Sequence, residues 1–266
     1  MLLSGVQSAA LALAGMPVLR ARPAWAALAQ GEQPAVIDRR LIVNADDFGM
    51  CEATDDGIIE AHDHGIVSSA SLLVNASHAV EAVRAAARYP KLGLGLHADF
   101  PRGGGWVFDP GNLPALRREL EHQFDTFVRL VGRPPDHLDS HHHLHRAFNV
   151  GRLFLKLGSR YGVAVRGLSD VTFVGSFYGV LYGKTELSQI SVDYLIGLIR
   201  RLAPGVTELS CHPSRKGTIP DDLYATERAV ELATLTDPRV RDVLRDERIQ
   251  LINYGEYNRL AAPRIG

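Results

Sequence analysis

One stretch decides the fold: Leu41-Ile42-Val43-Asn44-Ala45-Asp46-Asp47-Phe48-Gly49, an apolar run that ends in two adjacent carboxylates and a glycine. Buried carboxylates are unfavourable unless a cation or a shared proton compensates them, and two neighbouring ones also repel each other. The stretch therefore predicts a strand that ends at a metal and general-base site. In the competing interpretation, Asp46-Asp47 is a helix N-cap with a solvated neighbour, which the preceding apolar run disfavours.

From Arg40 onward, short apolar runs alternate with longer amphipathic ones, which is typical of repeated βα units and a parallel sheet. Predicted strands cover 41–44, 67–74, 92–97, 137–139, 163–166, 206–210 and 249–253. Predicted helices cover 53–64, 77–88, 115–131, 150–161, 192–202, 227–235 and 239–246. Residues 169–184 have no clear periodicity and are predicted to be an ordered loop. The fold class is α/β, a distorted TIM-like β/α barrel of about seven strands.

Charge and cysteine content exclude several classes of protein. The net charge is −1 and no run of Lys or Arg occurs, so neither a nucleic acid nor an anionic membrane surface is an expected partner. Cys51 and Cys211 do not have the spacing of a zinc site or a disulfide framework. We expect both to be small buried hydrophobic residues.

Residues 1–39 are predicted to be an N-terminal extension, and residues 40–266 a single domain. Leu2–Leu19 is apolar but rich in Ser, Gly and Ala, so no integral membrane span is expected there. Ala24-Trp25-Ala26 has the pattern of a signal-peptide cleavage site, but no Lys or Arg precedes the apolar run. A cytoplasmic location is therefore favoured over export.

Polar clusters follow four of the predicted strands: Asp46-Asp47, His97, the run from Asp139 to His145, and His212. In barrels of alternating strands and helices, the active site is built at the carboxyl ends of the strands. Each cluster alone has an ordinary explanation, such as a core histidine or an exposed loop. Their shared position predicts one active site at that end of the barrel.

Alternate residues of an extended segment share a face, so His137, Asp139 and His141 would point the same way. His143 would join them if the extended segment reaches that far. Two imidazoles and one carboxylate from separate strands suit a catalytic divalent ion. Nitrogen ligands favour zinc, nickel, cobalt or iron, whereas the carboxylate keeps magnesium and manganese open.

Four motifs occur in order along the chain: Asn44-Ala45-Asp46-Asp47-Phe48-Gly49, Gly93-Leu94-Gly95-Leu96-His97, His137-Leu138-Asp139-Ser140-His141-His142-His143-Leu144-His145 and Glu208-Leu209-Ser210-Cys211-His212-Pro213. Together they resemble the motifs of the YdjC-like carbohydrate deacetylases, which include chitooligosaccharide deacetylase and hopanoid-associated deacetylases. The resemblance extends from about Leu41 to about Tyr254.

The resemblance implies a polysaccharide-deacetylase-like barrel and metal-dependent removal of acetyl groups from N-acetylated sugars. It implies one divalent ion, Mg²⁺ or Zn²⁺, bound by Asp47, His97 and His141. It also implies that Asp46 is the catalytic base and His212 the acid.

Arg166, at the end of the fifth predicted strand, would then hold Asp46 or a substrate oxygen; this role is our own inference. The expected substrate is an N-acetylated amino sugar or a short oligosaccharide of the chitooligosaccharide type. Sugar-stacking faces are expected from aromatic residues, namely Trp106, Phe108, Phe177 or Tyr178. A homodimer is compatible with the sequence but not required by it.

Two other functions fit the same metal site. A metal-dependent phosphoesterase would present several basic residues, whereas only Arg166 and Arg215 are obvious candidates. A sugar- or metal-binding module would keep the ligands without turnover, and the presence of both Asp46 and His212 argues against it.

Overall fold

The computed structural model describes residues 38–100, 111–217 and 224–261. The compact unit begins at Asp38. Trp106, Phe108 and nearly all of the predicted N-terminal extension lie outside the described residues, so the boundary at residue 39 stays a prediction. No helix in the described ranges is both long and apolar enough to cross a membrane.

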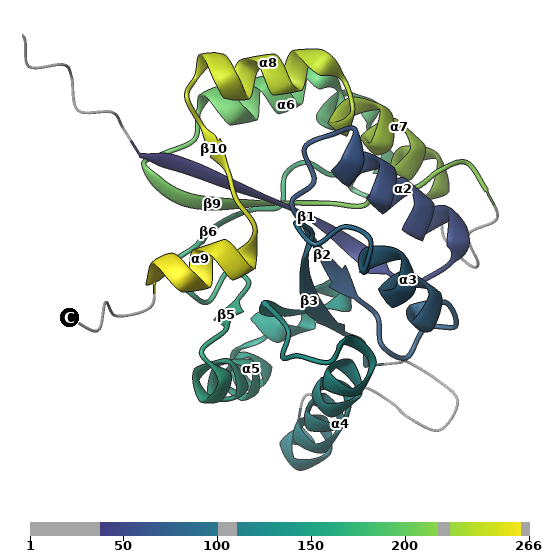
Figure 1. The fold of residues 1–266 in the computed structure, drawn as a ribbon, viewed down its shortest axis with the longest axis vertical. Coiled ribbons are helices and arrows are strands. Elements are labelled where there is room, and N and C mark those ends of the chain that lie inside the picture. Colours follow the sequence, from purple (N-terminus) through teal and green to yellow (C-terminus); the bar gives the residue numbers. More distant parts are fainter. Residues whose placement is uncertain (1–37, 101–110, 218–223, 262–266) are drawn as a thin grey trace, which may run out of the picture. The chain divides into compact units, whose positions relative to one another are not determined.

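A parallel sheet forms the centre of the described unit (Figure 1). Its strand order is β5-β4-β3-β2-β1-β9-β6, and β10 pairs with β1 in addition. The strands are β1 (Arg39–Phe48), β2 (Ser69–Leu72), β3 (Gly93–Ala98), β4 (His137–Ser140), β5 (Ala164–Val165), β6 (Thr172–Val174), β9 (Gly205–Cys211) and β10 (Gln250–Leu251).

Helices connect the strands and cover the outside of the sheet (Figure 1). They are α2 (Glu52–Asp63), α3 (Ala79–Ala86), α4 (Leu113–Val131), α5 (Phe148–Tyr161), α6 (Val192–Arg200), α7 (Ala225–Leu235), α8 (Pro238–Asp246) and α9 (Tyr254–Ala261). Two short 3₁₀ segments are η1 (His141–Arg146) and η2 (Leu187–Ile190). Parallel pairing requires such crossovers, since a tight hairpin can join only antiparallel strands.

Helix α4 shows how local sequence produces these elements. Its buried face repeats every three or four residues, at Leu116, Leu120, Phe124 and Phe127. The Asn112 side chain accepts a hydrogen bond from the Ala115 N–H at the start of the helix, and Gly132 ends it with a φ of 81°. One apolar stripe and two caps therefore define the whole element.

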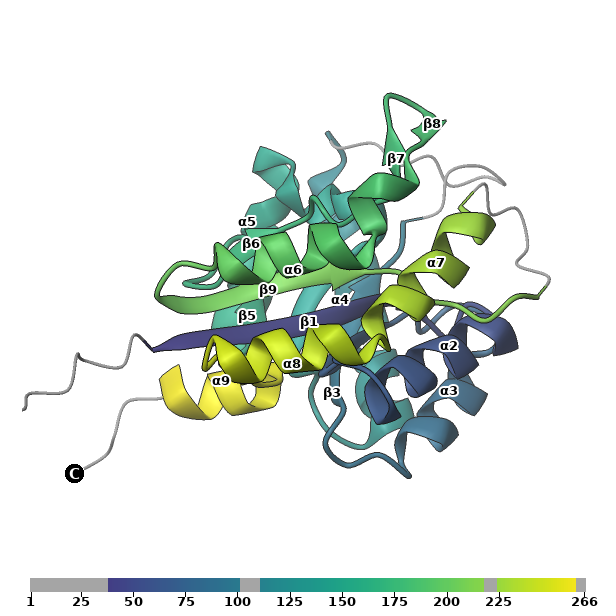
Figure 2. The ribbon, with the colours of Figure 1, turned by 90° about the horizontal axis from the view of Figure 1, so that it is seen from above.

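The predicted alternation of strands and helices is confirmed, although α9 was not predicted and the segment 169–184 was predicted wrongly. Residues 169–184 were predicted to be a loop, but they contain β6 and a hairpin of β7 (Val180–Leu181) and β8 (Lys184–Thr185). β6 pairs with β9 at the edge of the sheet, whereas the hairpin projects away from the sheet (Figure 2). Strands of two or three partly exposed residues are too short to show a periodicity in the sequence. They form because pairing with neighbouring strands stabilises them.

β1 is the central strand and its last eight residues, Leu41–Phe48, are all buried. It pairs with β9 in unbroken register from Arg39 to Ala45, and the two long strands lie side by side in Figure 2. On its other side the register with β2 shifts between Ala45 and Phe48. The irregularity coincides with the two carboxylates, which places them at the carboxyl end of the sheet.

Candidate active site

The side chains of Asp46 and Asp47 both point toward the inner face of the curled sheet. In a regular strand, consecutive side chains point to opposite faces. Asp47 has a φ of 68°, and the pairing of β1 with β2 shifts at the same place. Such irregularities re-aim side chains, and left-handed backbone at a non-glycine residue is often found at functional sites. The Asp55 carboxylate accepts a hydrogen bond of 2.6 Å from the Gly49 N–H and so stabilises the turn that follows.

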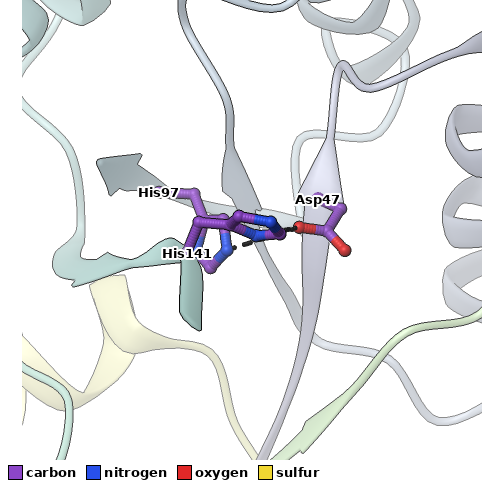
Figure 3. Close-up of side chains that lie close together, drawn as sticks. All are labelled: Asp47, His97 and His141. Atoms are coloured by element: carbon purple, nitrogen blue, oxygen red, sulfur yellow. Dashed lines mark ion pairs between the residues drawn. The ribbon is translucent and has the colours of Figure 1, made fainter. Parts of the chain in front are cut away.

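Three side chains from three segments converge at this end of the sheet (Figure 3). Asp47 Oδ1 lies 3.4 Å from His97 Nε2 and 3.1 Å from His141 Nδ1. β1, β3 and the start of η1 supply them, and their ligand atoms all lie within 4.8 Å of one another. These are the three residues that the sequence predicts to bind a metal.

The geometry of this set fits a divalent cation. Two ligand atoms about 2.0–2.2 Å from one ion lie roughly 3.0–3.5 Å apart at octahedral or tetrahedral angles, which matches both distances. Asp47 Oδ1 is buried and has no hydrogen-bond partner among the described residues. Burial opposes its ionisation, but the Arg228 guanidinium and both imidazoles hold the pKa of Asp47 well below its usual value. Asp47 is therefore an anion with one oxygen available to a cation.

Arg228, on α7, accounts for the other oxygen of Asp47. Its Nη2 donates a hydrogen bond of 2.7 Å to Asp47 Oδ2, and both side chains are buried. Arg228 is not among the residues predicted from the sequence. The available signal was the charged set Glu227, Arg228 and Glu231 within an otherwise apolar helix, all three of which are buried.

Asp139 orients His97 from behind. Its Oδ1 lies 2.7 Å from His97 Nδ1, which leaves Nε2 directed at Asp47. Burial opposes protonation of His97, but Asp139 and Asp46 raise its pKa to about 10. A carboxylate behind a metal-binding histidine fixes the ring and increases its basicity, and a bound cation would displace this proton.

The predicted shared face of His137 and Asp139 is confirmed, since both contact the Ser71 hydroxyl. The extended backbone on which that prediction depended ends at Ser140. His142 and His143 each have a φ of 54°, so the alternation does not continue to His143.

Arg166 occupies the interior beneath the site and is fully buried. It donates two hydrogen bonds to Asp46, of 2.7 and 2.6 Å, and one of 2.7 Å to Glu208 Oε1. Its Nη2 also lies 2.7 Å from Asp139 Oδ2. Asp46, His97 and Asp139 are near enough to form a second cation set, but the guanidinium already compensates both carboxylates.

Asp46 is thereby kept ionised. Burial raises its pKa, but the Arg166 charge and hydrogen bonds, together with His97, lower the pKa below the ordinary value. Since Arg166 has no exposed surface, the geometry places it against Asp46 rather than against a substrate oxygen.

His212 lies beside Asp46, with Nε2 3.8 Å from Asp46 Oδ2. The rings of Tyr178 and Tyr224 contact its ring edge-on, with centroids 5.6 and 5.7 Å away. Burial lowers the pKa of His212 to about 4 despite the nearby carboxylates. The imidazole is neutral at physiological pH and one edge of it reaches the site.

Two predicted sugar-stacking residues can be judged from their exposure. Phe177 is 1% exposed, so it offers no face to a ligand and that prediction is wrong; its side chain packs in the hydrophobic core. Tyr178 is 39% exposed and stacks on Tyr224, with centroids 4.5 Å apart.

Comparisons with known proteins test the resemblance drawn from the sequence motifs. The family described as YdjC-like protein matches residues 40–246. A carbohydrate deacetylase from Geobacillus stearothermophilus is 34% identical over 251 residues, which cover 84% of this chain and 99% of that protein. A chitooligosaccharide deacetylase from Enterobacter sp. (strain 638) is 30% identical over 237 residues, covering 77% of this chain and 94% of that protein. The resemblance drawn from the motifs is confirmed.

A solved structure has the same fold. It is a candidate cellobiose-phosphate cleavage protein from Enterococcus faecalis V583, with a TM-score of 0.72 and 25% sequence identity. The match covers 83% of this chain and 99% of that one. The predicted fold class, a distorted TIM-like barrel, is confirmed.

Proposed function

The chain belongs to the YdjC-like protein family, and we propose that it is a metal-dependent carbohydrate N-deacetylase. The observation that supports this most directly is the convergence of Asp47, His97 and His141 beside a second, ionised carboxylate, Asp46. Two relatives that are at least 30% identical are named as a carbohydrate deacetylase and a chitooligosaccharide deacetylase. The reaction is hydrolysis of the amide bond between an acetyl group and an amino sugar.

Asp47 Oδ1, His97 Nε2 and His141 Nδ1 would hold the cation, for which we propose Mg²⁺ or Zn²⁺. A divalent ion at this position supplies Lewis acidity, which polarises the acetyl carbonyl and acidifies water. The protein's own contribution is to fix the ligands. Arg228 engages Asp47 Oδ2 and Asp139 engages His97 Nδ1, so Asp47 and His97 each direct their other ligand atom toward the cation site.

Asp46 is the proposed base. It is adjacent to Asp47 in sequence and has an ionised carboxylate, which can take a proton from attacking water. Arg166 and the Asn44 amide hold the carboxylate in place, with Asn44 Nδ2 2.9 Å from Asp46 Oδ1. These contacts keep the Asp46 carboxylate oriented, and the cation that provides them, Arg166, is buried.

His212 is the proposed acid, because Nε2 points toward Asp46 and the amine that departs must gain a proton. The exposed ring of Tyr178 lies beside His212 and offers a stacking face to the sugar. Its position supports an N-acetylated sugar or short oligosaccharide as the substrate.

The phosphoesterase alternative has less support, because the basic residues it needs are already paired. Arg166 is buried among carboxylates, and Arg215 pairs with Asp56 and Glu60 at 3.0 and 2.7 Å. A binding module without turnover stays the main alternative, and it differs from the enzyme only in activity.

The decisive experiment is an assay of acetate release from N-acetylglucosamine oligomers of increasing length, with metal-reconstituted protein and an Asp46→Asn variant. We expect release by the wild-type protein and a rate at least about 100-fold lower in Asp46→Asn. Full activity in the variant would exclude Asp46 as the base. No release from any N-acetylated sugar would favour the binding module.

A further inference from the structure

The His212 ring lies between two carboxylates. Its Nε2 is 3.8 Å from Asp46 Oδ2, and its Nδ1 is 4.0 Å from Glu231 Oε1. Nδ1 is buried and has no hydrogen-bond partner in the described part of the chain. A buried ring nitrogen that faces a carboxylate across a gap of this size is an unusual arrangement, since most buried polar atoms are paired.

Glu231 is held rigidly behind the histidine. It is fully buried on α7; its Oε2 accepts a hydrogen bond from the His212 backbone N–H, and its Oε1 accepts one of 2.6 Å from the Tyr224 hydroxyl. The Tyr224 oxygen accepts a hydrogen bond from the Gly179 N–H in turn. Glu231 therefore has two donors that stabilise it as a carboxylate, and its Oε1 faces His212 Nδ1 across the gap.

A neutral histidine faces a chemical difficulty as an acid. If His212 gives the Nε2 proton to the departing amine and receives none, an imidazolate anion remains, which is strongly unfavourable. The difficulty disappears if Nδ1 takes up a proton as Nε2 releases one. Glu231, whose Oε1 lies 4.0 Å from Nδ1, is able to supply that proton when it is protonated.

We propose that Glu231 is a positioning residue that stores the proton which His212 passes to the departing amine. This inference rests on the proposed deacetylase function. In the step, the amine nitrogen takes the proton from Nε2 as its bond to the acetyl carbon breaks, and Nδ1 takes the proton from Glu231 Oε1. The imidazole stays neutral, and Glu231 becomes a carboxylate that Tyr224 and the His212 N–H stabilise.

The charge environment supports a single shared proton. Burial raises the pKa of Glu231 to about 8 and lowers the pKa of His212 to about 4. Between these two pH values the Glu231–His212 pair holds one proton in addition to the N–H of the neutral imidazole, whichever atom carries it. Other titratable or charged groups also act on this pair. They are Asp46 and Asp47 on β1, His97 on β3, Cys211 on β9, Arg228 on α7, Tyr224 at the N-terminus of α7, and Tyr178.

The first test compares two leaving groups in the metal-loaded full-length chain. Glu231→Gln keeps the shape of the side chain and one of its two accepting oxygens, but it has no transferable proton. We expect kcat for an N-acetylated sugar to fall about 100-fold with little change in KM, while hydrolysis of 4-nitrophenyl acetate stays within about threefold, because its weakly basic leaving group needs no acid. Equal loss on both substrates would overturn the proposal.

Glu227→Gln is the matched control. Glu227 lies on the same helix, is also buried, and accepts a hydrogen bond from Thr185 Oγ1 rather than contacting His212. We expect it to keep both activities, so that a loss specific to Glu231→Gln cannot be attributed to a damaged α7.

The second test needs no activity and so separates this inference from the proposed function. The infrared C=O band of a protonated carboxylic acid should be present in the wild-type protein at pH 7 and disappear as the pH rises through about 8. It should be absent from Glu231→Gln and unchanged in Glu227→Gln. Absence of the band from the wild type at pH 7 would overturn the stored proton, whereas its presence in a protein without deacetylase activity would refute only the proposed function.

Discussion

Arg166 holds both carboxylate oxygens of Asp46, at 2.7 and 2.6 Å, across 120 positions of the sequence. The same guanidinium contacts Asp139 and Glu208, so one buried cation compensates carboxylates from β1, β4 and β9. Buried charges are tolerated only when they are paired and hydrogen-bonded. The active-site end of the sheet is thus stabilised by a charge network that also orients the proposed base.

A protein in which Arg166 is replaced should unfold at a much lower denaturant concentration than the wild type. Arg166→Met leaves Asp46, Asp139 and Glu208 without their shared cation, and we expect a loss of roughly 3–5 kcal/mol in the free energy of unfolding. Urea denaturation measures this. Arg215→Met is the control, because its ion pairs with Asp56 and Glu60 are largely exposed and should contribute less than about 1 kcal/mol. Equal effects of the two substitutions would contradict the network.

Metal affinity should depend on Asp47 and His141. Asp47→Asn and His141→Ala each remove one of three converging ligand atoms, so calorimetric titration with Zn²⁺ or Mg²⁺ should show affinities lower by more than about 100-fold, beyond the effect typical of outer-shell residues. His64→Ala, at a largely exposed histidine on the C-terminal end of α2, should bind like the wild type. Unchanged affinity in both ligand variants would exclude this cation site.

Gly95 should not tolerate a side chain. A Cβ at this position in β3 would lie 2.2 Å from the His137 ring, which stacks on Tyr254 with centroids 4.0 Å apart. We expect Gly95→Ala to destabilise the protein by about 1–3 kcal/mol. In contrast, Gly197→Ala in α6 meets only the flexible end of Arg201 and should stabilise by up to about 1 kcal/mol. Thermal unfolding that ranks the two variants in the opposite order would show that the β3–β4 packing is incorrect.

Acid should destabilise the protein partly through His145. This side chain is fully buried with Nδ1 2.8 Å from the Ser140 hydroxyl, and burial lowers its pKa to about 3. Below pH 6.5 the unfolded chain binds a proton that the folded protein does not, so stability is lost as the pH falls from 6.5 toward 3. For one such group the loss between pH 7 and pH 5 is about 2 kcal/mol.

His145→Asn keeps a polar group near Ser140 but does not titrate, so its stability should decrease less over the same interval. Urea unfolding at pH 7 and pH 5, in the wild type and in this variant, measures the difference directly. An identical decrease in both proteins would mean that His145 is protonated in the folded state.

Much of the fold follows from local patterns. The long helices, such as α4, have an apolar stripe and recognisable ends, and the buried strands are short apolar runs between them. β6 and the β7–β8 hairpin could not be predicted this way. They exist because of pairing with distant or adjacent backbone, and their residues show no periodicity of their own.

The sequence by itself determined the α/β barrel class, the family, and the identity of the residues that converge, Asp46, Asp47, His97, His141 and His212. These were readable because each lies at the end of a recognisable strand. Only the tertiary structure decided how they are supported. The positive φ of Asp47 allows both carboxylates to point inward. Arg228 and Glu231 reach the site from α7, and Arg228 lies more than 180 positions after Asp47 in the sequence. Local patterns report backbone preference and burial, whereas these contacts depend on which distant side chains the curled sheet brings together.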